Sequence, residues 1–295
     1  MELEDLQSAN IEDRRGDVSS VGIPGLGGGG HLGLGAMIAI GLISWFFHID
    51  PRTLISGAQM LQGGSASVSQ SASASSTSVA PEDKTGRFVS SILAETEVVW
   101  SKVLPEQKGI AYVDPKLVLY RGVTQSACGG QAQASMGPFY CPIDQKVYLD
   151  TSFFDDMRAK YGGGGDFPYA YVIAHEIGHH VENLLGILPK VQAAQQRASS
   201  DAESNKLSVG VELMADCLAG VWAANADAKW HILQPGDVEK AVATATAIGD
   251  DRLEKQAQGY AVPDSFTHGT SAQRVFWLKT GLKTGQVDSC NTFGQ

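Results

Sequence analysis

The sequence has no surplus of positive charge. It carries 22 lysines and arginines against 32 aspartates and glutamates, which gives a net charge of -10. Proteins that bind nucleic acid cluster basic side chains against the phosphates, and no basic patch stands out in this chain. We therefore expect no nucleic-acid partner. A chain of 295 residues with 43% hydrophobic content is long enough to bury a substantial core.

Cysteine is also scarce. The four cysteines, Cys128, Cys141, Cys217 and Cys290, form no CxxC pair, which argues against a structural zinc site made of thiolates. Four cysteines allow three disulfide pairings, and the sequence does not choose among them. We expect Cys128 to pair with Cys141, closing a local loop, and Cys217 to pair with Cys290, tying the C-terminal tail to a helix. Free buried thiols are the alternative.

The N-terminal region divides into three predicted segments before the folded domain. Residues 1–31 are polar and then glycine-rich, so we expect no packed core there. Residues 32–49 are 18 positions without a charged side chain, near the minimum for a transmembrane helix. Residues 50–81 are rich in serine, alanine and glycine and are expected to be a flexible linker. The folded domain is expected over residues 82–295.

The apolar segment 32–49 favours a retained anchor. A cleaved signal peptide has a short basic leader, whereas the leader here is long and acidic. A buried core helix is the alternative interpretation. The arginines beside the segment show only a slight bias. The cysteines favour a cytoplasmic N-terminus and a domain outside the cytoplasm, as in a single-pass membrane protein.

The domain itself is predicted to contain many helices and little sheet. Apolar residues at helical spacing predict helices over 86–104, 166–186, 207–226, 237–257 and 270–282. Short β-rich runs predict strands within 111–120 and 146–150. This balance indicates an α+β domain that is mainly helical, with a small β-sheet.

Histidine is rare, yet three of the seven histidines lie between positions 175 and 180. His175, Glu176 and His179 form the pattern H-E-x-x-H. On a helix, residues four apart lie about 40° apart around the axis, so both imidazoles can bind one cation. Glu176 lies on the flank of that face, where it can act as a base on water. Zinc suits such a site, so we expect one Zn²⁺ per chain.

A catalytic zinc usually has a third protein ligand. Glu182 and Leu185 exclude the metzincin-like extension of the motif, which needs glycine and histidine there. Glu212 and Asp216 are four residues apart on a largely apolar helix, and buried carboxylates need a partner. We expect Glu212 to bind zinc and Asp216 to accept the second N–H of a zinc-bound histidine. The rival is Asp216 as the ligand, with Glu212 outside the site.

Several stretches of the chain resemble a known bacterial family, the putative neutral zinc metallopeptidases. They are GPFYCPIDQKVYLD, AHEIGHHVENLLG, ELMADCLAGVWA, AIGDDRLEKQAQGYAVPDSFTHGTSAQR and CNTFGQ. The resemblance covers nearly the whole chain. It implies a zincin-like fold, hydrolysis of protein or peptide substrates, and a zinc site at His175, Glu176 and His179 with Glu212 as third ligand. It implies no particular substrate.

Peptide hydrolysis also needs a donor for the developing oxyanion besides the metal. His268, next to Gly269 in a loop before a helix, is our first candidate. The other candidates are His231, Tyr169, Tyr260 and Arg252. The expected function is thus a membrane-anchored zinc peptidase of the bacterial envelope.

Two other functions compete with this expectation. One is a non-catalytic envelope protein in which zinc only joins two helices, its fourth position closed by His180, His231 or a cysteine. The other is a secreted binding module with only vestigial metal. Metal content separates the binding module from the two zinc proteins.

Overall fold

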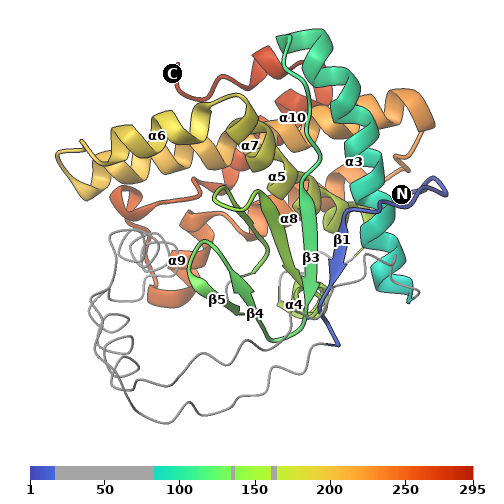
Figure 1. Ribbon diagram of the computed structural model, residues 1–295. Coiled ribbons are helices and arrows are strands. Elements are labelled where there is room, and N and C mark those ends of the chain that lie inside the picture. The colour runs from blue at the N-terminus through green and yellow to red at the C-terminus, as the bar shows by residue number, and fades with distance from the viewer. Residues whose placement is uncertain (17–82, 134–136, 161–164, 295) are drawn as a thin grey trace, which may run out of the picture.

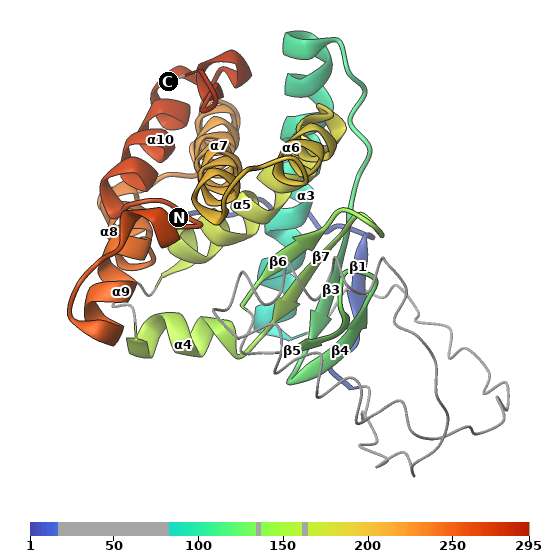
Figure 2. The same cartoon turned by 90° about the vertical axis from the view of Figure 1, so that its left-hand side faces the viewer.

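The computed structural model describes residues 1–16, 83–133, 137–160 and 165–294. Helices dominate these residues, and the strands form one small sheet and one hairpin (Figure 1). The α+β class expected from the sequence, mostly helical with a small sheet, is confirmed. The largest helices gather on one side of the sheet, as the view turned by 90° shows (Figure 2).

The main sheet has four strands and mixed direction. Its order is β1 (Ile11–Asp13), β3 (Lys116–Tyr120), β7 (Lys146–Asp150) and β6 (Phe139–Cys141). The pairs β1–β3 and β3–β7 are parallel, whereas β6 runs antiparallel to β7. A separate hairpin pairs β4 (Val123–Ser126) with β5 (Gly130–Gln133).

Eight α-helices complete the described part of the chain. They are α3 (Lys84–Lys108), α4 (Phe153–Lys160), α5 (Asp166–Leu184), α6 (Ile187–Gln195), α7 (Asp201–Trp230), α8 (Asp237–Ala247), α9 (Asp250–Gln258) and α10 (Ser271–Thr284). Two 3-10 turns follow α9 and α10, η2 (Pro263–Ser265) and η3 (Val287–Cys290). Helix α7 is central, because it packs along α10 and along α5. One large apolar cluster joins these helices to the sheet.

One predicted helix is divided in two. The sequence predicts a single helix over 237–257, whereas the chain breaks between α8 and α9. The backbone N–H of Asp250 donates to the carbonyl of Gly269 at 3.0 Å. This contact turns the start of α9 towards the loop before α10, which lies beside the candidate site described below. A partner distant in sequence thus overrides the local helical pattern.

The N-terminal residues belong to the folded domain, which corrects the predicted division of the chain. Strand β1 pairs with β3, and Ile11 is buried in the main core. The N–H of Glu4 also donates to Glu95 Oε1 on α3 at 3.1 Å. The prediction of no packed core before residue 31 is therefore wrong for residues 1–16. A strand of three residues has too little periodicity to be recognised alone.

The two ends of the segment between β1 and α3 meet in space. Arg15 Nη2 lies 2.5 Å from Asp83 Oδ2, so the chain returns to the place it left. The predicted anchor, residues 32–49, lies outside the described residues. Within them, α7 alone is long and apolar enough to cross a membrane by composition, but 72% of its apolar window is buried. That burial is typical of a core helix.

Both disulfides have the pairing expected from the sequence. Cys128 joins Cys141, which ties the β4–β5 hairpin to β6. Cys217 joins Cys290, which ties the central helix α7 to η3 near the C-terminus. All four cysteines are therefore paired.

Candidate metal centre

Helix α5 carries the two histidines of the motif. Pro168 lies in the first turn of α5, where a backbone N–H has no acceptor within the helix, so the proline removes no helical hydrogen bond. Gly186 follows the end of the helix with φ 70°. Between the two histidines, a Cβ on Gly178 would lie 3.0 Å from the carbonyl oxygen of Ala215 on α7. A glycine at this position lets α5 and α7 approach closely. The approach brings the acidic face of α7 to the histidines.

Three potential ligands converge where α5 meets α7. His175 Nε2 lies 3.1 Å from Glu212 Oε2, and His179 Nε2 lies 3.6 Å from Glu212 Oε1. One donor atom from each of the three residues lies within 4.8 Å of the others. Two imidazoles and one carboxylate are a donor set that zinc accepts, with an open fourth position. The arrangement can hold a single zinc ion.

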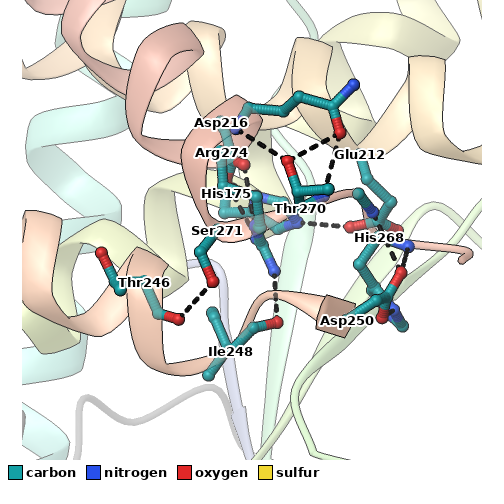
Figure 3. A network of polar contacts seen from close by, with 12 residues as sticks. His175, Glu212, Asp216, Thr246, Ile248, Asp250, His268, Thr270, Ser271 and Arg274 are labelled. Carbon is teal, nitrogen blue, oxygen red and sulfur yellow. Dashed lines mark hydrogen bonds and ion pairs between the residues drawn. The ribbon is translucent and has the colours of Figure 1, made fainter. Parts of the chain in front are cut away.

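Asp216 lies behind His175, with no exposed surface. Its Oδ1 is 3.0 Å from His175 Nδ1 and accepts from the Tyr171 hydroxyl at 2.6 Å. Arg274 on α10 donates to both oxygens of Asp216 at 2.9 Å (Figure 3). When the imidazole is neutral, an N–H at Nδ1 leaves Nε2 unprotonated and directed at Glu212. Asp216 therefore holds the tautomer of His175 that a metal needs.

Arg274 reaches Asp216 because α10 lies unusually close to α7. A Cβ on Gly281 would lie 1.9 Å from the carbonyl oxygen of Cys217, so no other residue fits there without movement. Burial disfavours the charged form of Asp216, but Arg274 and His175 outweigh it and lower the pKa of Asp216 to about 2. Asp216 is thus an anion beneath the site.

Glu182 supports the second histidine in the same way. Its Oε2 lies 2.8 Å from His179 Nδ1, three residues earlier on the same helix. The side chain is fully buried, and burial raises the pKa of Glu182 to about 7. Each imidazole thus has a buried carboxylate on its outer nitrogen. In the sequence Glu182 counted only as evidence against another motif; its i,i+3 spacing from His179 was the signal for this contact.

The charges around the three ligands favour a cation. Burial lowers the pKa of His175, but the carboxylates of Asp216 and Glu212 outweigh it and raise the pKa to about 10. Burial likewise opposes charge on Glu212, yet His179, His175 and His268 hold its pKa well below the usual range. A divalent cation would supply the positive charge that both imidazoles otherwise take up as protons.

Glu176 is next to the ligands and buried, with 7% of its surface exposed. Burial raises its pKa, although the nearby His175 and His179 partly oppose the rise. A carboxylate with a raised pKa beside a metal site has the properties of a general base. The environment thus separates the two acids: Glu212 stays ionised, as a metal ligand needs to be, whereas Glu176 can gain and release a proton.

His268 is held beside Glu212 by Asp250. The Asp250 carboxylate accepts the backbone N–H groups of residues 267, 268 and 269 at 2.7, 2.6 and 3.0 Å. Its other oxygen lies 3.1 Å from His268 Nδ1 (Figure 3). The loop is therefore fixed, and its histidine contributes to the low pKa of Glu212. Sequence reasoning singled out His268 but missed Asp250.

The other candidates named from the sequence point elsewhere. The Tyr169 hydroxyl donates to the carbonyl of Phe154, and Arg252 and Tyr260 are exposed. His231 caps the C-terminus of α7, 19 residues after Glu212 and so about 28 Å along the helix.

The residues that could close a structural zinc site also have other partners. His180 is fully buried, with Nε2 at 2.6 Å from the carbonyl oxygen of Val113 and Nδ1 at 3.0 Å from the hydroxyl of Tyr140. The cysteines are in disulfides. A purely structural zinc site would need His180, His231 or a cysteine to close its fourth position. The structure places none of these residues there.

Comparison with known proteins agrees with this geometry. A family model described as "putative neutral zinc metallopeptidase" matches residues 3–293. The chain is 48% identical to the uncharacterized protein YpfJ of Escherichia coli K12, over 98% of this chain and 97% of that protein. It is 40% identical to an uncharacterized protein of Mycobacterium tuberculosis, over 67% of each chain. No solved structure shows significant similarity. The chain belongs to the family of putative neutral zinc metallopeptidases.

Proposed function

We propose that this protein is a zinc-dependent peptidase that hydrolyses peptide bonds in proteins or peptides. The observation that carries the proposal is the convergence of His175, His179 and Glu212 within 4.8 Å beside the buried Glu176. A site that served only to join helices has no need of a base in this position. The family description, a zinc metallopeptidase, supports the same reaction class.

The chain's own residues supply the proton transfers. A bound zinc ion would polarise the substrate carbonyl and lower the pKa of water towards about 7. Glu176 takes a proton from the attacking water and passes it to the leaving amine. His268, oriented by Asp250, donates a hydrogen bond to the oxygen on which negative charge develops. Asp216 and Glu182 keep His175 and His179 in their binding tautomers.

The proposed place of action is outside the cytoplasm, at the bacterial envelope. Two disulfides account for all four cysteines, and disulfides persist in oxidising compartments. The apolar segment 32–49 is proposed to hold the protein at the membrane. The hydrolytic proposal does not depend on this location.

The test is metal content together with hydrolysis of a casein digest, followed by mass spectrometry. We expect wild type to bind one zinc per chain and to cleave peptides. Glu176→Gln should keep the zinc, because the three ligands are unchanged. Its rate of peptide hydrolysis should be about 10²–10⁴-fold lower than that of wild type, because the general base is gone. Glu239→Gln, an exposed glutamate on α8, is the matched control and should behave as wild type. A zinc-loaded wild type that cleaves nothing, or a Glu176→Gln variant with full activity, would overturn the proposal.

A further inference from the structure

A cavity of about 340 Å³ opens beside the candidate metal centre. The turn after β6, helix α6 and the N-terminal half of α7 form most of it, and Asn183 of α5 and Thr267 in the loop before α10 complete the lining. Glu212 is part of its wall, so the cavity continues directly from the ligand cluster. Its volume lies in the range of ligand sites in proteins. A group bound at the metal would therefore have this cavity next to it.

The lining of the cavity is mostly apolar. Six apolar residues contribute, namely Pro142, Ile143, Leu188, Pro189, Val191 and Val211. Glu212 is the one charged residue among the described residues of the lining. Of the uncharged polar residues, Gln195 donates to Ser208 Oγ at 2.7 Å and Asn183 donates to the Tyr140 hydroxyl at 3.1 Å. These amide groups are already engaged within the protein.

We propose that the cavity binds a large apolar side chain of the substrate residue next to the scissile bond; this rests on the proposed peptidase function. A basic side chain would find one acidic partner in the described lining, Glu212, and the carboxylate of Glu212 is proposed to bind the metal. An acidic side chain would find no cation in the described lining. Burying either charge without a partner is costly, whereas an apolar side chain gains free energy from the same burial. Ile143, 68% exposed at the turn, extends the apolar surface outwards.

Binding of amino-acid hydroxamates to the zinc-loaded full chain tests this selectivity without requiring turnover. The hydroxamate group chelates the metal, and the side chain samples the neighbouring cavity. Isothermal titration should show leucine hydroxamate binding at least about ten-fold tighter than the glycine, lysine and glutamate hydroxamates, since a buried apolar group is worth about 10–200-fold. Equal affinities would refute the cavity assignment. A chain that binds no zinc would instead refute the proposed function.

A variant on α6 links the selectivity to this cavity. Val191→Trp should fill it, leave the zinc content at one per chain, and reduce the affinity for leucine hydroxamate to that for glycine hydroxamate. Lys190→Trp is the matched control, because Lys190 is exposed on the same helix and does not line the cavity. It should keep the preference for leucine. A Val191→Trp variant with an undiminished preference would contradict the proposal.

A separate observation concerns the membrane. Strand β1 pairs with β3 along Ile11–Asp13, and Arg15 meets Asp83 at 2.5 Å. A single membrane crossing between residues 16 and 83 would place β1 and β3 on opposite sides and prevent both contacts. We infer that residues 1–16 and the described part of residues 83–294 lie on the same side of the membrane. A cytoplasmic N-terminus with the domain outside, as expected from the sequence, does not fit this fold.

Labelling of introduced cysteines tests this topology in the full chain. The native cysteines are in disulfides, so Asp5→Cys and Lys279→Cys each add one exposed thiol. In intact spheroplasts, a membrane-impermeant maleimide should react with both positions. If both positions are protected until lysis, the two parts of the chain still lie on the same side of the membrane, but the proposed location outside the cytoplasm is refuted. Reaction at one position and protection at the other would refute the inference.

Discussion

Replacement of Asp216 by asparagine should affect both folding and metal binding. The Asp216 carboxylate touches His175, Tyr171 and Arg274 and has no exposed surface. Asparagine has nearly the same shape but no charge. The substitution therefore leaves Arg274, which is only 3% exposed, as a buried cation without its anion. It also replaces one of the two acceptor oxygens by an NH2 donor, so His175 and Arg274 have to share the single oxygen that remains.

The expected loss of stability follows from this burial. Removing one partner of a buried ion pair costs about 3–5 kcal/mol. For a domain of this size each kcal/mol shifts Tm by about 2–4 °C, so Asp216→Asn should lower Tm by roughly 6–20 °C. The control is Asp288→Asn, since Asp288 pairs with Lys108 and is 79% exposed. A surface pair contributes less than about 1 kcal/mol. Zinc affinity should fall about 10–100-fold in Asp216→Asn alone.

Thermal unfolding of the metal-free proteins and zinc competition with a chelator measure the two effects. The double variant Asp216→Asn, Arg274→Met removes both buried charges. It should recover stability but not zinc affinity, because His175 still lacks its carboxylate. If Asp216→Asn is as stable as Asp288→Asn, the buried pair does not have the assigned strength. If zinc affinity returns in the double variant, Asp216 acts through Arg274 and not on His175.

Three further substitutions have distinct expected outcomes. Glu212→Ala should abolish tight zinc binding in metal analysis, because two protein ligands remain; retained stoichiometric zinc would refute its role as a ligand. Replacing both Cys217 and Cys290 by serine opens a loop of 73 residues and should cost about 4 kcal/mol in urea unfolding, whereas an unchanged midpoint would contradict this. Burial raises the pKa of Glu95 from 4.5 to about 7, so the native state keeps a proton that the unfolded state loses, and stability should fall as pH rises from about 4.5 to 7. Glu95→Gln should remove that fall when urea unfolding is measured at pH 5 and pH 8; an unchanged pH dependence would refute it.

The sequence by itself determined the features that depend on local spacing. The pattern His175, Glu176 and His179 needs only a helix, because the helix repeat brings residues four apart to one face. Glu212 was predictable because an apolar helix that carries an acid must be buried and must supply a partner for it. Strand β7 was predicted with its observed bounds, Lys146–Asp150, from its β-rich composition. These features are visible within a single element of the chain.

Only the tertiary structure decided which distant residues complete the site. Arg274 meets Asp216 across 58 residues, and strand β1 meets β3 across more than 100. Asp250 meets His268 across 18 residues, through a helix break that local periodicity does not show. The physical reason is that such contacts depend on how closely α5, α7 and α10 pack, and this packing depends on the whole core. The helical repeat in a sequence predicts which residues share one face of one helix. The partner of a buried charge, in contrast, comes from whichever element packs against that face.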